Sequence, residues 1–170
     1  MLLHRRSLAL LLASWTSVYG QGNLARAQLL DLELLGLGVT YSLNYDTRFT
    51  ESDKGIGGRI GVSYFQGVDV RVFALPLIMN YLAGKEGHYL ELGAGGTFVS
   101  SSYQSDACGC VTPEFLILGR YGNQVMGNLS IGYRRQPTGG GLSFRLGLSP
   151  VISKDRFVPW WPYVGLGYAF

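Results

Sequence analysis

The sequence predicts an all-β fold in which a single antiparallel sheet closes into an up-and-down barrel of eight strands. Apolar side chains recur at every second position over most of the chain, which is the period of a strand. Short polar turns separate these segments, as in a meander of hairpins. The composition combines 25 glycines and 13% aromatic residues with only 15% charged residues. Together these features favour strands over helices throughout the chain.

The first 20 residues have the pattern of an export signal. Such a signal has a basic start, an apolar stretch and small residues at the cleavage site, found here at 4–6, 8–13 and 18–20. A second cleavage pattern at 25–27 lies farther from the apolar stretch and stays open as an alternative. We therefore expect a signal peptide over 1–20 and one barrel domain over 21–170.

The charge balance excludes one class of partner. Removal of 1–20 takes away Arg5 and Arg6 but no acid, which leaves 12 basic and 11 acidic residues. This near-neutral balance predicts no nucleic-acid partner. After the signal there is no run of 18 apolar residues, so a helical membrane span is excluded on length.

The longest alternation runs over residues 35–49. Its odd positions are apolar or aromatic, with one threonine: Leu35, Leu37, Val39, Tyr41, Leu43, Tyr45, Thr47 and Phe49. Its even positions are small or polar. Because successive side chains of a strand point to opposite faces, this segment has one apolar and one polar face.

Six further segments show the same alternation, and they lie at 60–64, 73–81, 90–98, 129–133, 142–148 and 164–170. The segment 73–81 is the least regular, because Val72, Ala74 and Ile78 also make its second face apolar. With the first segment this gives seven clear strands. An even number is required if both ends of a barrel face the periplasm.

Five short turns separate these strands, at 50–55, 66–69, 84–87, 137–140 and 153–156. One longer insertion, 103–124, contains Cys108 and Cys110. The eighth strand comes either from Phe115–Gly119 within this insertion or from a break in the first segment at Gly36–Gly38. The break gives short periplasmic turns and an external insertion, whereas the unbroken alternation over 35–49 opposes it. Both alternatives stay open.

The kind of polar face distinguishes a membrane barrel from a soluble β-fold. A water-facing surface would carry more lysine and glutamate, whereas this face is rich in Gly, Ser, Thr and Asn, which suits a narrow lumen filled by side chains. Aromatic residues end many of the apolar stripes, as at membrane interfaces. They are Tyr45, Phe49, Tyr64, Tyr81, Phe98, Tyr133, Trp160 and Trp161. We therefore expect a transmembrane β-barrel, with a soluble secreted β-protein as the alternative.

The last eight residues, Tyr163 to Phe170, resemble the C-terminal β-signal of outer-membrane proteins. The positions that carry the resemblance are Gly165, Tyr168 and the terminal Phe170. The resemblance implies recognition by the barrel assembly machinery and a place in the Gram-negative outer membrane, with membrane lipids as neighbours.

Further segments are similar to the small uncharacterised outer-membrane β-barrels of the Bacteroidetes. They are 34–36, 41–49, 80–84, 90–95, 132–134 and 144–147, so the resemblance covers nearly all of the mature chain. It implies a fold and a location, and it brings no established activity. The partner of the external loops stays unknown.

Six charged residues fall on the polar, lumen-facing side of the predicted strands: Asp46, Arg48, Arg59, Glu91, Arg134 and Arg145. Charges in a narrow lumen need partners because their desolvation is costly. We expect an ion-pair network that fills the barrel. A narrow channel or a pocket for a small ligand is the alternative.

The remaining candidate chemistry is sparse. After the signal the only histidine is His88, and it cannot act with Glu91, because residues three apart on a strand face opposite sides. A lipid-modifying enzyme is therefore the weakest hypothesis, and we expect no catalytic residue, cofactor or metal. Cys108 and Cys110 are in an oxidising compartment that permits a local disulfide. The favoured function is a structural or interaction barrel with a closed lumen.

Overall fold

The computed structural model describes residues 26–67, 70–103, 122–154 and 156–170. Its elements are β1 Gln28–Leu35, the 3-10 turn η1 Gly36–Gly38, β2 Tyr41–Arg48, β3 Gly55–Gln66, β4 Val70–Lys85, β5 His88–Tyr103, β6 Gly122–Arg135, β7 Gly141–Leu148, β8 Val151–Ile152, β9 Phe157–Val158 and β10 Pro162–Ala169. Among the described residues there is no helix long and apolar enough to cross a membrane. The predicted signal at 1–20, both cysteines and Phe115–Gly119 lie outside the described residues.

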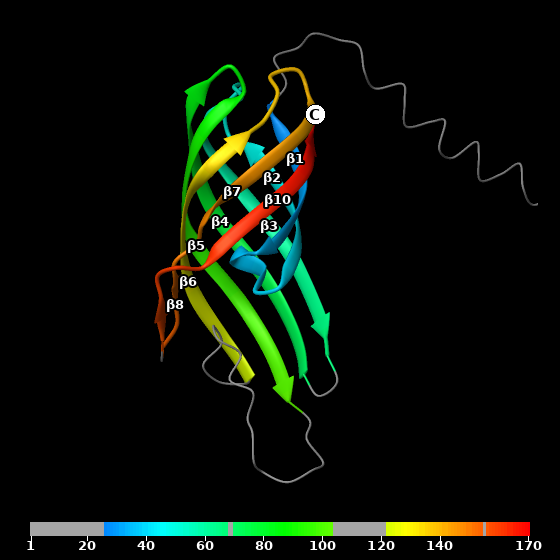
Figure 1. Cartoon of the computed structure of the whole chain (residues 1–170), viewed down its shortest axis with the longest axis vertical. Coiled ribbons are helices and arrows are strands. Elements are labelled where there is room, and N and C mark those ends of the chain that lie inside the picture. The colour runs from blue at the N-terminus through cyan, green and yellow to red at the C-terminus, as the bar shows by residue number, and fades with distance from the viewer. Residues whose placement is uncertain (1–25, 68–69, 104–121, 155) are drawn as a thin grey trace, which may run out of the picture.

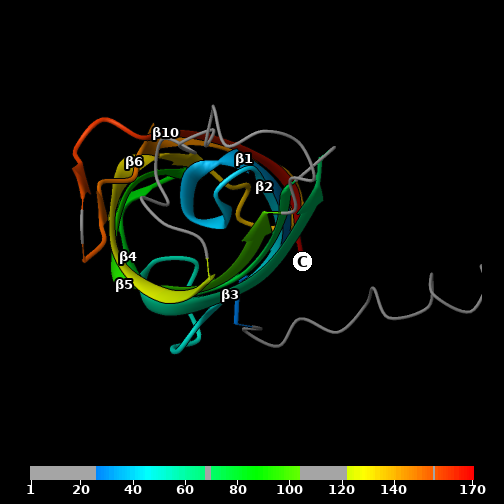
Figure 2. The ribbon, with the colours of Figure 1, turned by 90° about the horizontal axis from the view of Figure 1, so that it is seen from below.

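The strands form a closed antiparallel barrel (Figures 1 and 2). Strands β1 to β7 pair in sequence order, β7 pairs with β10, and β10 pairs with β1, so that Leu32 lies opposite Leu166. The wall therefore has eight strands, as the sequence predicts. The short hairpin β8–β9 is not part of the wall, since it extends the sheet from β6 at Gly127 and Asn128.

The eighth strand comes from the break at Gly36–Gly38, which decides between the two open alternatives against one unbroken strand over 35–49. The chain reverses between β1 and β2, where Leu35 and Val39 have φ angles of 60° and 74°. Val39 forms a tight γ-turn, in which the amide of Thr40 donates to the carbonyl of Gly38 at 2.9 Å. Apolar and polar residues keep alternating from Leu35 through this reversal, so the sequence pattern gives no sign of the turn.

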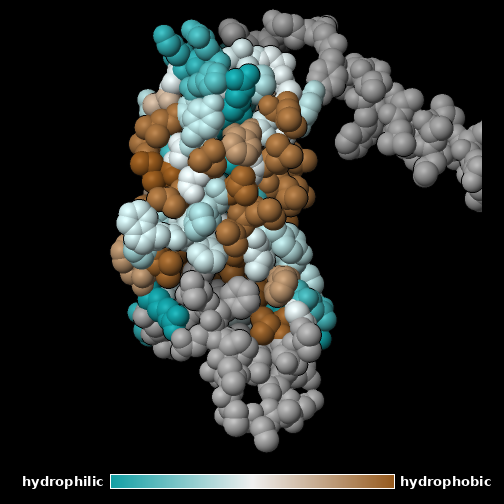
Figure 3. Space-filling view, in the orientation of Figure 1, coloured by the Kyte–Doolittle hydropathy of each residue, from teal (hydrophilic) through white to brown (hydrophobic). Residues whose placement is uncertain are grey.

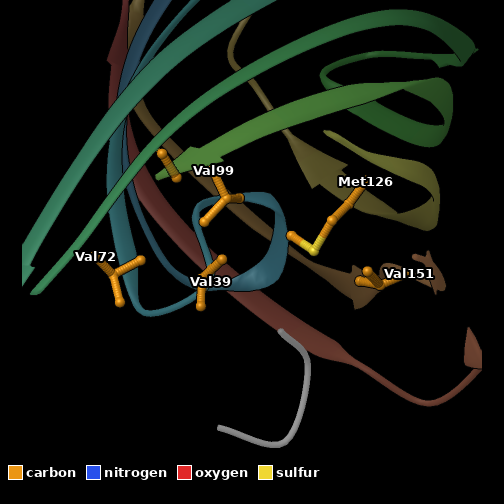
Figure 4. Packing of buried hydrophobic residues seen from close by; sticks show 6 residues of the cluster. Val39, Val72, Val99, Met126 and Val151 are labelled. Atoms are coloured by element: carbon orange, nitrogen blue, oxygen red, sulfur yellow. The ribbon is translucent and has the colours of Figure 1, made fainter. Parts of the chain in front are cut away.

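The reversal also changes which way two apolar residues point. Leu37 and Val39 were expected on the outer face, but both are buried inside the barrel. Val39 packs there with residues from the surrounding wall and from β8, which are Val72, Ala74, Val99, Met126 and Val151. Figure 4 shows the turn of η1 curling into the barrel among these side chains. One end of the lumen is therefore filled by an apolar cluster.

Along the strands most apolar side chains point outward and most polar side chains point inward, which is the reverse of the arrangement in a soluble protein. In β4 the outward Leu77 and Met79 are 65% and 61% exposed, while the inward Val72 and Ala74 are buried. The outward surface carries a broad hydrophobic band over several strands (Figure 3). An antiparallel sheet with its apolar side outward and charged side chains inside differs from a sandwich core. The outward stripes predicted over β3 to β7 and β10 are confirmed.

The two ends of the barrel differ. The start of β1 and the C-terminus lie at one end (Figure 1), together with the turns after β2, β4 and β6. At this end Glu86 and Gly87 form a two-residue turn with φ angles of 57° and 79°, as a type I′ hairpin requires. The other end carries η1 and β8–β9, and β3 to β6 extend beyond the shorter strands there. The predicted turn at 153–156 joins β8 to β9 rather than two wall strands.

Candidate functional site

The barrel interior brings together all six charged residues that the sequence places on the lumen side. Asp46 and Arg48 lie on β2, Arg59 on β3 and Glu91 on β5. The other two, Arg134 and Arg145, lie on β6 and β7. Every one of these six residues is at most 2% exposed. The strand period predicts this inward direction, and the closed wall brings the six strand positions within contact distance.

Glu91 is the centre of the network, because its carboxylate accepts hydrogen bonds from three guanidinium groups. Arg134 binds it through two nitrogens, with Nε 3.0 Å from Oε2 and Nη2 2.9 Å from Oε1. Arg145 binds in the same way, with both distances 2.9 Å. Arg59 Nη2 adds a third contact to Oε1 at 2.9 Å. Paired guanidinium contacts of this kind are the strongest and most directional that a carboxylate makes.

Asp46 forms the second centre of the network. Its carboxylate accepts from Arg134 at 2.9 and 3.2 Å, from Arg59 at 3.2 Å, and from Arg48. The amide of Asn80 also donates to it. Arg48 in turn donates to the carbonyl of Gly55 at 2.9 Å. Asp46 thus connects the Glu91 centre, through Arg134 and Arg59, to the turn after β2.

The register explains why the network needs a central carboxylate. Arg134 and Arg145 lie directly opposite each other on β6 and β7. Like charges in such a position repel and destabilise the strand pair. Glu91 offsets this repulsion because it binds both guanidinium groups at once.

Two members of the network, Asp31 and Glu33 on β1, are not among the six residues that the sequence predicts. Both are 1% exposed, and Arg145 Nη1 contacts them at 3.1 and 2.9 Å. Arg59 also reaches Glu33, at 3.4 Å. The signal was present in the sequence, because Leu30, Leu32 and Leu34 alternate with these acids. The apolar positions of β1 are even-numbered and those from Leu35 onward are odd-numbered, so the short stripe of β1 does not join the longer one.

With these two acids the network is electrically balanced. Asp31, Glu33, Asp46 and Glu91 carry four negative charges, and Arg48, Arg59, Arg134 and Arg145 carry four positive charges. Each of the eight has at least one partner of opposite charge. Such a site has no surplus charge with which to hold an ion. In the part of the chain that the structure describes, no group of three metal-binding side chains forms a metal site.

Small residues on the neighbouring strands make room for the long side chains. Gly165 lies between Glu33 on one side and Arg145 on the other in the strand register. A Cβ atom at this position would approach Oδ2 of Asp31 to 3.1 Å. The guanidinium of Arg145 also lies 5.1 Å from the ring centre of Tyr163, within the range of a cation–π contact.

Hydrogen bonds connect the charged network to the apolar cluster. The amide of Leu37 donates to Oε1 of Glu33 at 3.1 Å, and its carbonyl accepts from Thr97 at 3.1 Å. The indole of Trp161 donates to the carbonyl of Gly36 at 3.0 Å. The turn of η1 is therefore held inside the barrel by polar contacts as well as by burial of Val39.

The other predicted residues that the structure describes do not belong to the charged network, and they lie on both faces of the wall. His88 is on the outer face and Glu91 on the inner face, which confirms that they cannot act together. Tyr168 and Phe170 point outward at the end of β10 and are half exposed. Gly165 faces inward. Cys108 and Cys110 lie outside the described residues, so their predicted disulfide stays a prediction.

Comparison with known proteins supports the fold. The sequence matches no family model and no curated protein. The structure is similar to the N-terminal β-barrel domain of Pseudomonas aeruginosa OprF, with a TM-score of 0.58 and 14% identity over 88% of this chain and 100% of that one. It is also similar to the Yersinia pestis outer membrane protein Ail in a phospholipid bilayer nanodisc, with a TM-score of 0.48 and 12% identity over 85% of this chain and 99% of that one. At 14% identity, the similarity to the OprF domain supports the closed eight-stranded fold and carries no information about activity.

Proposed function

We propose that this chain is an integral outer-membrane β-barrel with a closed lumen, and that it has a structural or interaction role rather than a catalytic or conducting one. The observation that carries the proposal is the balanced network of eight buried charges beside the apolar cluster around Val39. The charged network and the apolar cluster fill successive parts of the lumen. An ion that crossed it would have to displace both.

The outward surface supports a place in the membrane. Exposed apolar residues lie on all eight strands of the wall, and the first and last strands are paired, so no strand edge of the wall is left open between β1 and β10. Hydrocarbon offers no partner to unpaired backbone groups, and closure meets this requirement. A charged interior behind an apolar exterior is the arrangement expected of a membrane barrel.

The orientation and assembly are part of the same proposal. Bacterial barrels have both termini in the periplasm and their longer loops outside. The end with the C-terminus would then face the periplasm, and η1 with β8–β9 would face the exterior. We propose that the barrel assembly machinery recognises β10 through Gly165, Tyr168 and Phe170, after removal of residues 1–20.

Energetics support a closed lumen over a narrow channel. Removing one partner of a buried ion pair costs about 3–5 kcal/mol, because the other charge is left without compensation in a poorly solvated site. Opening a path past Glu91 would disturb its pairs with Arg59, Arg134 and Arg145 together. The filled interior is therefore the state that the contacts favour.

Two measurements test the proposal. Cell fractionation followed by electrophoresis with and without boiling should give an outer-membrane band whose mobility shifts on heating, and a soluble band without a shift would overturn the membrane placement. Purified protein in planar bilayers should then give no single-channel conductance. Steady conductance would overturn the closed lumen and favour the narrow channel. Unchanged lipid A and phospholipid profiles on overexpression are expected, and altered profiles would favour a lipid-modifying enzyme.

A further inference from the structure

Three basic side chains form a row on the outer face of the barrel, at the end that carries the termini. Lys85 is the last residue of β4, His88 is the first of β5 and Arg135 is the last of β6. In the strand register Lys85 lies opposite His88, and His88 lies opposite Arg135. All three are exposed. The turn that joins β4 to β5 fixes this row, because the amide of Gln136 donates to the carbonyl of Gly87 at 2.8 Å.

Hydrogen bonds hold the arginine of this row in place. Nη1 of Arg135 lies 3.0 Å from Nε2 of His88, and Nδ1 of His88 lies 2.6 Å from the hydroxyl of Tyr133. A guanidinium can only donate, so Nε2 accepts and the ring proton is on Nδ1. His88 therefore accepts from Arg135 and orients it along the outer wall. Tyr133 lies one outward position farther from the end, next to Leu90.

The two cations of the row, Lys85 and Arg135, form no ion pair with a protein carboxylate in the part of the chain that the structure describes. Glu86, which is exposed in the turn between Lys85 and His88, makes no such pair either. Several other strands carry apolar outward residues at this end, namely Phe49, Ile56, Leu142 and Phe170. The outward cations at the strand ends thus gather on β4 and β6, on either side of His88, and hydrophilic surface lies over this region in Figure 3.

We propose that Lys85 and Arg135, with His88 as the positioning residue, bind the phosphate of an anionic phospholipid in the periplasmic leaflet. The proposal rests on the membrane placement above, because it needs this end of the hydrophobic band to lie at the level of the headgroups. A planar guanidinium matches two phosphate oxygens, while an ammonium adds a point charge. The apolar neighbours Ala83 and Leu90, which are the next outward residues of β4 and β5, would accommodate the acyl chain.

The test measures which lipid stays on the folded protein. Full-length mature protein is refolded in micelles with equal amounts of phosphatidylglycerol and phosphatidylcholine, and bound lipids are counted by native mass spectrometry. We expect phosphatidylglycerol to be retained about tenfold over phosphatidylcholine, because cations near a membrane surface favour anionic lipid. The K85Q/R135Q variant should lose this preference. Arg71→Gln removes an exposed outward cation near the far end of β4 and should retain it.

Two further arms keep the outcomes distinct. The His88→Phe variant retains both cations, so a partial loss of preference is expected from the loss of orientation alone. Millimolar inorganic phosphate should not displace the lipid, and complete displacement would overturn the lipid as the ligand. Equal retention of both lipids by wild-type protein would also overturn the proposal. The mobility shift on heating is recorded for every sample, so a failure of the barrel itself appears as a lost shift rather than as a lost lipid preference.

Discussion

The substitution Glu91→Gln removes the carboxylate that three arginines share. Arg134 and Arg145 are opposed in the register and both bind Glu91 through two nitrogens. Glutamine has nearly the same size, but its NH2 group would face guanidinium donors and its charge is lost. The interior would then hold one surplus positive charge beside a repelling pair. Because the partners stay buried, we expect a loss of about 3–5 kcal/mol in the free energy of unfolding.

The assay is urea unfolding of the refolded protein in phosphatidylcholine vesicles, followed by the fluorescence of Trp160 and Trp161. Glu86→Gln is the matched control, since Glu86 is exposed and forms no ion pair with the described residues. It should change stability by no more than about 0.5 kcal/mol. If the free energy of unfolding of the Glu91→Gln variant lies within about 1 kcal/mol of the wild-type value, the network is not a set of water-excluded, mutually dependent ion pairs, and the reasoning is refuted.

A second variant separates lost charge balance from lost packing. Arg145→Gln combined with Glu91→Gln restores neutrality and removes the opposed arginine pair. The double variant should lose less stability than the sum of the two single losses, because each substitution removes the charge that the other leaves unpaired. Purely additive losses would point to packing instead.

Three further predictions concern other parts of the barrel. Gly165→Val places side-chain atoms against Asp31 and should destabilise the barrel by about 1–3 kcal/mol, measured by the same urea titration. The double substitution L37G/V39G empties part of the apolar cluster, yet planar-bilayer recordings should stay silent because the charged network still fills the lumen. Phe170→Ala should lower the amount of folded barrel in cell envelopes, measured as the band whose mobility shifts on heating. The free energy of unfolding of the refolded protein should change by less than about 1.5 kcal/mol, since Phe170 is half exposed in the native state.

The fold was predictable because the period of two survives nearly everywhere along the wall. Strand direction, the outward stripes and the inward position of residues such as Arg134 follow from that period alone. The first hairpin was not predictable in this way. The odd-numbered apolar residues from Leu35 to Phe49 run through the reversal at Gly36 to Thr40 without a gap, although the backbone turns through positive φ angles at Leu35 and Val39 and the outward stripe of β1 occupies even positions. Only the geometry shows that two of these apolar side chains fill the lumen.

The network was predictable in its members but not in its pairs. Which arginine meets which acid depends on the stagger of neighbouring strands, and this is a property of the closed barrel rather than of any one segment. Arg145 and Asp31 are 114 residues apart in the sequence. The balance of four acids against four arginines emerges only when β1 is recognised as a strand.

The position of β1 gives the network a role in closing the barrel. Glu33 on β1, Gly165 on β10 and Arg145 on β7 occupy one row of the register, so the ion pair reaches across β10 over a residue that has no side chain. This row crosses the seam where the two ends of the sheet meet. In an open sheet these charges would face water, where ion pairs contribute little. Once the seam closes, water is excluded and the pairs become strong. Closure of the barrel and formation of the network therefore stabilise each other. A variant that weakens the ion pairs should also weaken the pairing of β1 with β10, and unfolding should become less cooperative.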